Sequence, residues 1–461
     1  MEQLRQQNSI RRRRAGFVGG LAVAGLSLAL AAPAWVQQQN PREVKVRGDK
    51  ARVEAGGYWL YNNLNSALAE AKKSGKPVLA IVRCIPCEAC AKLDEQVVEL
   101  NPEIRALLDK FVCVRLVTTN GMDLSLFQYD FDQSWTALTL NADRTIYGRY
   151  GTRSHQTESD QDITLSGFRK SLEKALQLHA AWPRDRAALQ AKTGPKPPYP
   201  SPDKMPIFKD RPASLNYEGT ASIVKDCIHC HQVGEALRKM PREAGLAIPE
   251  QAMFPYPNPR TLGFNMDPLE AATVKAVTAG SPAGRAGLKA GDEIQSLNGQ
   301  PILSTADIQW VLHHLGEPAR LQASVLRGGT RQKATVQMEL ASGWRRGEDL
   351  SWRASTWDLR RMATGGIKMD DLTDAERAQR GLGKTEMALL IKHVGQFGPH
   401  ALAMREGFKK DDLIVSIDGS TARMTETDVL VNNVQNRKPG ARVPTVVVRG
   451  GQRLNLMMPV Q

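Results

Sequence analysis

The feature that most constrains the fold of this chain is a repeat in its C-terminal half. Residues 287–294 read GLKAGDEI and residues 407–414 read GFKKDDLI, an offset of 120 positions. At the same offset, Asn298-Gly299 is matched by Asp418-Gly419. Such pairs favour β-hairpin turns, because Asn, Asp and Gly tolerate a positive φ. The repeat therefore predicts two copies of one small β-rich module.

The composition indicates several ordinary domains. The chain has 461 residues, which corresponds to about three or four domains. Hydrophobic residues make up 41% and charged residues 24%, which excludes a polytopic membrane protein and a wholly disordered chain. The net charge of +14 favours anionic partners only weakly, and we expect no nucleic-acid partner.

The N-terminus has the pattern of an export signal. Four arginines at 11–14 precede residues 15–36, which carry no charge, and Ala32-Pro33-Ala34 places small residues at a signal-peptidase site. We interpret residues 1–34 as a signal peptide; the alternative is an uncleaved anchor formed by residues 15–36. Both predict a periplasmic or otherwise extracytoplasmic protein, soluble after cleavage or held by the anchor, where cysteines can be oxidised.

Residues 57–183 alternate helix-like and strand-like patterns. An amphipathic helix pattern ends before Gly75, where glycine favours a helix C-terminus. Apolar runs at 78–82 and 111–117 predict buried strands. This alternation predicts an α/β layer fold.

The rest of the chain divides at proline clusters. Seven prolines fall between positions 195 and 212, which favours an extended, semi-rigid spacer. Between the repeats, three tryptophans interleave with arginines, and we expect them to pack a connector onto the flanking modules rather than to bind nucleic acid or a membrane. The predicted boundaries are a linker at 184–212, a short segment at 213–260, the first module at 261–341, the connector at 342–362 and the second module at 363–461.

Five of the six cysteines lie in two short clusters. Residues 84–90 read CIPCEAC, after a predicted strand and before an apolar helix pattern. At such a junction, backbone N–H groups and the helix dipole favour a thiolate, which lowers the thiol pKa from about 8.5. A second cysteine one turn further on can resolve a mixed disulfide. The pattern predicts redox chemistry; a zinc site and a structural disulfide are the alternatives, and Cys113 is expected to pack in the core.

This region resembles the thioredoxin-like superfamily. The resemblance is carried by KPVL at 76–79, by the cysteines and by Lys92-Leu93. It implies a catalytic nucleophile at Cys87, a resolving partner at Cys90 and an extra thiol at Cys84 that can pair with Cys87 instead. The family has a cis-proline facing the motif; this chain has DQSWTA at 132–137, and we expect Trp135 or Thr136 in that place.

Residues 227–231 read CIHCH, the attachment pattern for a c-type haem. Cys227 and Cys230 would form two thioethers, and His231 would ligate the iron. The motif resembles that of cytochromes c over these five residues, although the surrounding segment is small for a complete cytochrome fold. A second dithiol pair or a zinc site is the alternative. The candidate sixth ligands of the iron are Met240, Met253 and, more weakly, His229.

The repeated modules resemble bacterial PDZ domains. In the first, the resemblance is carried by TLGF at 261–264, by SPAG at 281–284 and by the repeat itself. It implies that a loop of Leu262, Gly263 and Phe264 presents backbone N–H groups to the C-terminal carboxylate of a peptide, beside an exposed strand edge. In the more diverged second module, the equivalent loop is expected at Leu382 and Gly383.

The glycines of the second module do not predict a nucleotide site. Gly383-Lys384-Thr385 is no phosphate loop, because Ala378 stands where the first glycine is needed. The chain also lacks a Gly-x-Ser-x-Gly motif, so we expect no serine-protease activity.

The predicted architecture is a multidomain chain with an α/β thioredoxin-like domain, a short haem-binding segment and two β-rich (α+β) PDZ domains. This order resembles a family of exported bacterial thioredoxin-like/PDZ proteins, some of which are selenoproteins; here all motif positions are Cys. We predict a thiol–disulfide oxidoreductase with haem c, whose partners are a client protein with thiols or disulfides, peptide C-termini and an electron carrier. The alternatives are a non-catalytic scaffold that senses redox state or a ligand, and an assembly chaperone for haem attachment.

Overall fold

The computed structural model describes residues 40–86, 91–99, 101–155, 161–219 and 221–461. The predicted signal peptide at 1–34 and the predicted active-site residues Cys87 and Cys90 lie outside the described residues. Within the ranges given, none of the helices combines the length and the apolar character needed to span a bilayer.

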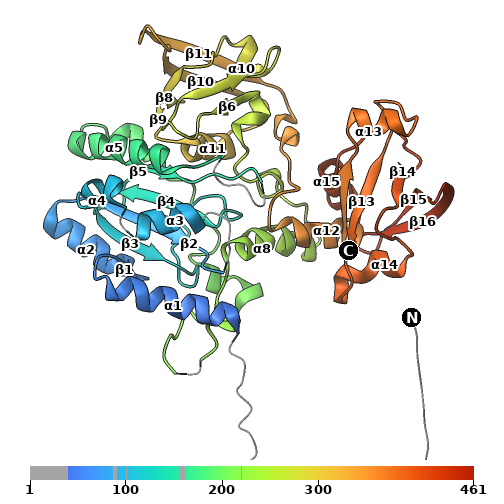
Figure 1. Cartoon of the computed structure of the whole chain (residues 1–461), viewed down its shortest axis with the longest axis horizontal. Helices are drawn as coiled ribbons and strands as arrows, with labels where there is room; N and C mark the ends of the chain where they lie inside the picture. The colour runs from blue at the N-terminus through green and yellow to red at the C-terminus, as the bar shows by residue number, and fades with distance from the viewer. Residues whose placement is uncertain (1–39, 87–90, 100, 156–160, 220) are drawn as a thin grey trace, which may run out of the picture. The chain divides into compact units, whose positions relative to one another are not determined.

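A five-stranded sheet forms the centre of the N-terminal domain (Figure 1), in the order β1-β3-β2-β4-β5. Strands β1 and β2 run parallel to β3, whereas β4 is antiparallel to β2 and β5. Every residue of β2 to β5 is buried, as the apolar runs predicted for β2 and β3. The strands are β1 (Leu60–Tyr61), β2 (Val78–Arg83), β3 (Val112–Leu116), β4 (Trp135–Leu140) and β5 (Ile146–Tyr150).

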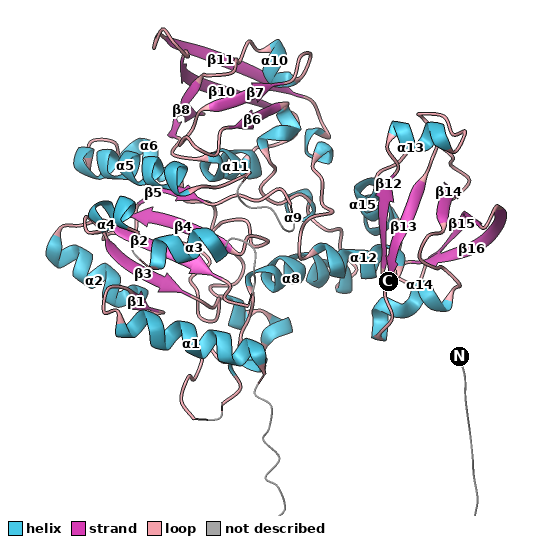
Figure 2. Ribbon diagram, in the orientation of Figure 1, coloured by secondary structure: helices cyan, strands magenta, loops and turns pink. Residues whose placement is uncertain are grey.

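Helices cover both faces of this sheet (Figure 2). Alternate residues of a strand point to opposite faces, so Leu79 and Ile81 of β2 join one apolar cluster and Ala80 joins the other. Helix α2 packs in the cluster of Ala80, and α3, α4 and α5 pack in the other. The helices are α1 (Pro41–Ala55), α2 (Leu64–Ser74), α3 (Ala91–Val98), α4 (Pro102–Leu108), α5 (Leu165–Ala181) and α6 (Arg186–Gln190).

The proline-rich segment packs onto the N-terminal domain and does not act as a separate spacer. It forms two short 3-10 helices, η1 (Pro202–Lys204) and η2 (Pro206–Phe208). Asp203 accepts a hydrogen bond from the backbone N–H of Gly121 at 2.9 Å. Met205 and Phe208 pack against Leu124. The apolar residues between the prolines thus give the segment a buried side, which proline content alone did not indicate.

The segment that carries CIHCH is also held by the N-terminal domain. The carbonyl of Ile228 accepts hydrogen bonds from the backbone and hydroxyl of Thr119, at 3.3 and 2.7 Å. The N–H of Ile228 donates to Asn120 Oδ1 at 2.7 Å. The CIHCH motif therefore joins the surface of the N-terminal domain. Its helices are α7 (Ile223–Asp226), α8 (Cys230–Glu243), α9 (Glu250–Met253) and η3 (Pro259–Leu262).

The first repeated module is β-rich, with a four-stranded sheet in the order β11-β10-β8-β9 and a separate β6-β7 pair. Asn298 has a φ of 46° in the turn between β8 and β9, as its hairpin signature predicted. The elements are β6 (Phe264–Met266), β7 (Val274–Val277), α10 (Pro282–Arg285), β8 (Glu293–Leu297), β9 (Gln300–Pro301), α11 (Thr305–His314), β10 (Ala319–Leu326) and β11 (Lys333–Leu340).

The second module runs through a similar order of elements, in one sheet with the order β12-β13-β14-β15-β16. Asp418 has a φ of 52°, at the place that matches Asn298. The main difference is the added helix α13 between the first two strands. The elements are β12 (Ile367–Asp371), α13 (Asp374–Gln379), β13 (Leu389–Val394), η5 (Gly398–Ala401), α14 (Leu402–Arg405), β14 (Leu413–Ile417), α15 (Glu426–Asn436), β15 (Arg442–Arg449) and β16 (Gln452–Pro459).

The connector between the modules contains η4 (Trp344–Gly347) and α12 (Thr356–Thr364). Trp344 packs against the core of the first module. Arg345 is buried and donates to the carbonyls of Leu312 and His313, at 3.0 and 3.1 Å. These contacts satisfy carbonyls at the C-terminus of α11, which a helix leaves without internal partners.

Candidate functional site

The structure brings the two cysteine clusters together. Cys84 follows β2, and its Sγ lies 3.5 Å from Nδ1 of His229, a residue 145 positions later. Cys84 is 6% exposed. The sequence predicted two separate sites, whereas the described residues form one junction between the N-terminal domain and the CIHCH segment.

The backbone of Cys84 is fixed by the loop before β4. Its N–H donates to the carbonyl of Ser134 at 3.0 Å. Arg83 Nη1 donates to the carbonyls of Cys84 and Ser134, at 2.7 and 3.1 Å. Ser134 is therefore the residue whose backbone contacts Cys84. The motif cysteines that Trp135 or Thr136 is expected to face, Cys87 and Cys90, lie outside the described residues. Trp135 begins β4, and its indole donates to Asp94 at 3.1 Å.

A buried charge network lies on the helix α3 side of the junction. Asp94 accepts two hydrogen bonds from Arg115, at 2.7 and 2.8 Å, and lies 3.3 Å from Nε of Arg83. Burial opposes ionisation of Asp94, but the hydrogen bonds and charges of the two arginines outweigh it, and its pKa lies below the usual range. Asp49 of α1 binds the other side of Arg115, at 3.0 and 3.1 Å. These pairs fix α3, the helix that follows the predicted active-site cysteines.

The sulfurs of the second cluster lie against hydroxyl groups of the N-terminal domain. Cys230 Sγ is 3.2 Å from the hydroxyl of Tyr129, and Cys227 Sγ is 3.8 Å from that of Thr118. Both cysteines are buried. Burial raises the pKa of the Cys227 thiol to about 11, so this thiol is protonated at neutral pH.

The two histidines of this cluster stack on each other, with ring centroids 5.7 Å apart. Burial, and then the charge of His231, lowers the pKa of His229 to about 4. Burial also lowers the pKa of His231. Both imidazoles are therefore neutral at pH 7, and the ring beside Cys84 carries no charge there.

The described arrangement does not fit a covalent haem. Haem attachment turns both sulfurs to one porphyrin and an axial histidine to its iron, whereas each sulfur here packs against the thioredoxin-like domain. Met240 is nine residues after His231 on α8, which places it about 13 Å further along the helix axis, too far to share an iron. Met253 packs in an apolar cluster with Phe254. Haem c thus stays a prediction from the motif.

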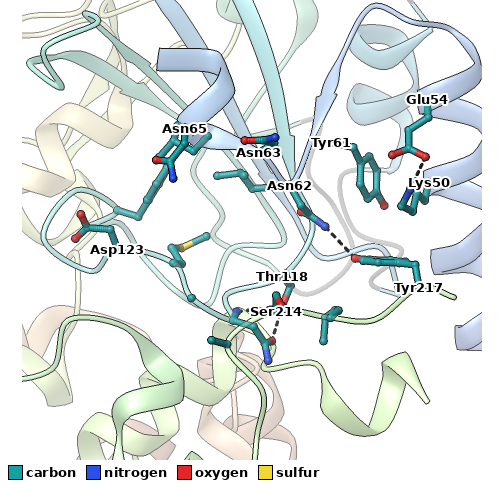
Figure 3. Close-up of a pocket in the computed structure, with 18 of the residues that line it drawn as sticks. Lys50, Glu54, Tyr61, Asn62, Asn63, Asn65, Thr118, Asp123, Ser214 and Tyr217 are labelled. Atoms are coloured by element: carbon teal, nitrogen blue, oxygen red, sulfur yellow. Dashed lines mark hydrogen bonds and ion pairs between the residues drawn. The ribbon is translucent and has the colours of Figure 1, made fainter. Parts of the chain in front are cut away.

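A polar cavity of about 610 Å³ lies beside this segment (Figure 3). Its walls come from the end of β1, the loop after β3 and residues 213–217. Asn62 donates to the hydroxyl of Tyr217 across it, at 2.9 Å. Thr118 and Asn120 form part of its wall. Thr118 also contacts the thiol of Cys227, and Asn120 accepts from the backbone N–H of Ile228. The cavity therefore shares one wall with the second cysteine cluster.

The predicted peptide loop of the first module precedes β6. Gly263 has a φ of 84°, and its carbonyl accepts from the N–H of Thr278 at 2.8 Å. Leu262 and Phe264 are buried in the core of the module. The ring of Tyr256 stacks on His313 at 4.1 Å, so the chain just before this loop packs against α11.

The prediction for the second loop is wrong. Leu382 and Gly383 follow α13, between β12 and β13, and do not precede the first strand of the module. The N–H of Gly383 is already bound by Glu386 Oε2 at 2.9 Å. The equivalent of Gly263 is Gly366, whose carbonyl accepts from the N–H of Gly395, directly after β13, at 2.8 Å. The added helix α13 shifted the sequence match.

Sequence reasoning missed several residues of the junction. Tyr129 and Ser134 carry no motif, and His229 was considered only as an iron ligand. Thr118 and Asn120 are ordinary loop residues, and their role depends on a segment about a hundred positions away. A sequence signal existed only for His229, which stands inside the CIHCH motif.

Comparison with known proteins identifies two domains. A thioredoxin-like family model matches residues 59–139, and a PDZ domain model matches residues 260–338. The chain therefore contains a thioredoxin-like domain and a PDZ domain. These matches agree with the sheet around β2 and with the module that begins at η3.

Curated relatives match part of the chain. A probable periplasmic serine endoprotease DegP-like of Pseudomonas savastanoi pv. phaseolicola is 29% identical over 39% of this chain and 36% of its own length. The periplasmic pH-dependent serine endoprotease DegQ of Escherichia coli is 28% identical over 42% of this chain and 38% of its own length. A probable periplasmic serine protease do/HhoA-like of Haemophilus influenzae is 30% identical, over 42% and 36%. The chain spans little more than a third of these relatives.

A solved structure, the HtrA-type protease AlgW with decapeptide, covers 31% of this chain and 49% of its own, at 19% identity and a TM-score of 0.19.

Proposed function

We propose that this protein is an extracytoplasmic thiol–disulfide exchange protein that docks a partner through its PDZ domain. The contact of 3.5 Å between Cys84 Sγ and His229 Nδ1 carries the proposal, because it joins the second cysteine cluster to the strand that leads into CIPCEAC. The export pattern of the N-terminus and the periplasmic relatives support the location.

The proposed chemistry uses the three cysteines of the first cluster. The Cys87 thiolate attacks a client disulfide, forms a mixed disulfide and releases one client thiolate. The Cys90 thiolate then attacks Cys87 Sγ and releases the second client thiolate, so the client gains two electrons and the Cys87–Cys90 pair becomes a disulfide. Cys84, whose Sγ lies 3.5 Å from His229 Nδ1, is the proposed alternative partner of Cys87.

The test is reduction of insulin disulfides by the full mature chain. We expect Cys87→Ser to abolish turnover and Cys84→Ser to slow it. Cys113→Ala is the matched control, because Cys113 is buried on β3 and lies outside both clusters. Turnover that survives unchanged in Cys87→Ser would contradict the proposal.

A second candidate is a non-catalytic PDZ scaffold that senses redox state. The relatives favour it, because they are named as periplasmic proteases and not as redox proteins. Peptide capture that differs between reduced and oxidised protein, without insulin turnover, would support it.

Haem c and an electron carrier as a partner are further proposals, and they rest on the motif. The pyridine haemochrome spectrum of protein matured with a cytochrome c assembly system decides between a haem protein and a thiol-only protein. A covalent haem signal would mean that residues 227–231 adopt an arrangement other than the one described above.

A further inference from the structure

The second module carries a strand edge that a peptide could extend, and this edge is already in use. Strand β12 is the outermost strand of its sheet and pairs with β13. Peptides that bind by strand addition pair with the free backbone N–H and C=O groups of such an edge. Here the N–H of Met369 donates to Oε1 of Glu426, the first residue of α15, at 2.8 Å.

The carboxylate that binds this edge is fixed by a second residue. Arg360 of α12 donates to both oxygens of Glu426, at 3.0 and 2.6 Å. The side chain of Arg360 is 0% exposed and that of Glu426 is 4% exposed. Breaking such a buried pair leaves an uncompensated charge, so the contact resists displacement by a peptide.

Helix α12 packs over the same side of α15. Leu359, Met362 and Ala363 join one apolar cluster with residues of α15. The carbonyl of Ala363 accepts from Asn433 Nδ2 at 2.9 Å, and Asn433 is buried. The residues of α15 in this cluster are Leu430, Val431 and Val434.

The first module differs at the matching positions. Both module helices begin after a capping hydroxyl, Ser304 in one and Thr425 in the other, so Thr305 matches Glu426 and Gln309 matches Leu430. Gln309 donates to the carbonyl of Tyr256 at 2.9 Å. Among the described residues, no side chain hydrogen bonds to the backbone of β6. The strand edge of the first module thus lacks a side-chain contact like the one that Glu426 makes with Met369 in the second module.

We propose that the second module binds its own chain: α12 is the internal ligand of the groove between β12 and α15, and external peptide C-termini are left to the first module. The proposal is independent of the cysteine chemistry. The second module also contacts helix α8 of the same chain. Arg242 of α8 donates to the carbonyls of Val434 and Gln461, at 2.7 and 2.6 Å. Through these hydrogen bonds the second module holds α8, the helix that begins at Cys230.

The test is amide hydrogen exchange on the full chain, resolved to β12. We expect the Met369 amide to be protected and Glu426→Ala to speed its exchange at least about tenfold, since a hydrogen bond to a charged group is lost. Arg360→Met is a second variant. It keeps the Glu426 carboxylate that accepts from Met369 but removes the cation that holds this carboxylate in place. Glu406→Ala is the matched control, because Glu406 pairs with Arg442 on the surface of the same module.

Two results would overturn the proposal. One is a Met369 amide that exchanges as fast in the natural protein as in Glu426→Ala. The other is protection of β12 on addition of a library of decapeptides with free C-terminal carboxylates, because a peptide would then enter the groove assigned to α12. Protection confined to β6, or no further protection of β12, supports it.

Discussion

Tyr129 is a buried residue whose phenol contacts the second cysteine cluster. Its hydroxyl lies 3.2 Å from Cys230 Sγ. Burial raises the pKa of the phenol well above its ordinary value, and the charges of Cys230 and Cys84 raise it further. The phenol stays protonated when either sulfur is anionic, so its O–H can donate to a thiolate at Cys230.

Glu235 of α8 is a second residue whose charge state is set by its surroundings. Burial raises its pKa to about 8, and the carboxylates of Asp358 and Asp132 add to the shift. The folded state holds this proton more tightly than the unfolded chain, so the free energy of unfolding falls as the pH rises from about 4.5 to about 8. We expect Glu235→Gln to remove this fall, by up to about 1.4 kcal/mol per pH unit in that window.

Urea unfolding across this pH window, and above it, measures the effect. Glu243→Gln is the control, because Glu243 is an exposed residue of the same helix that pairs with Lys239 at 3.6 Å. The control should follow the natural protein at every pH. Equal slopes for the natural protein and Glu235→Gln would show that Glu235 does not hold its proton in the fold.

At the scale of elements, local patterns were sufficient where one strand or turn decides the outcome. The apolar run at 78–82 became β2, because a strand buried on both faces needs apolar residues without alternation. Gly75 ends α2 with a φ of 71°, as a glycine after a helix pattern predicts. Asn298 and Asp418 both adopt a positive φ in the predicted hairpins.

The candidate site was predictable only in part, because long-range contacts assemble it. The CIHCH segment was assigned to a separate haem site, but Thr119 and Asn120 bind its backbone through ordinary loop side chains. No pattern in the segment itself indicates this docking. The second peptide loop was misplaced at Leu382 because α13 is inserted after β12, and the repeat could not reveal an insertion.

Arg353 joins the connector to the loop before β4. Its Nη1 contacts both oxygens of Asp130, at 2.8 and 2.7 Å, and lies 3.4 Å from Asp132. The arginine and both carboxylates are almost fully buried. We expect Arg353→Met to lower the free energy of unfolding by about 3–5 kcal/mol, because the buried carboxylates of Asp130, Asp132 and Glu348 lose their shared cation.

The matched control for this variant is Arg423→Met, measured by urea unfolding under the same conditions. Arg423 also binds two carboxylates, those of Asp371 and Asp374, but its side chain is 35% exposed. Water screens such a pair, so the expected loss is about 1 kcal/mol or less. Similar losses in the two variants would show that burial does not set the strength of the Arg353 contact.

At the scale of the molecule, the thioredoxin-like domain meets the PDZ domain through a buried ion pair. Lys192 Nζ lies 2.7 Å from Asp307 Oδ1, and both side chains are 0% exposed. Asp307 also accepts from the backbone N–H groups of Arg149 and Leu303, at 3.2 and 3.0 Å. Burial lowers the pKa of Lys192, and the charge of Asp307 opposes the shift. A contact of this kind depends on geometry, since either charge alone is costly to bury.

A double-mutant cycle tests whether this pair holds the two domains together. We expect Lys192→Met and Asp307→Asn each to lower the free energy of unfolding by about 3–5 kcal/mol, because each leaves one buried charge without its partner. The double variant should lose less than the sum, since no charge is then left unpaired. Urea unfolding measures the cycle, and limited proteolysis of the proline-rich segment reports on separation of the domains. The control is Lys196→Met, at an exposed lysine of that segment, which should change neither the free energy of unfolding nor the rate of proteolysis. Losses that simply add in the double variant would show that the two charges do not act together across the contact.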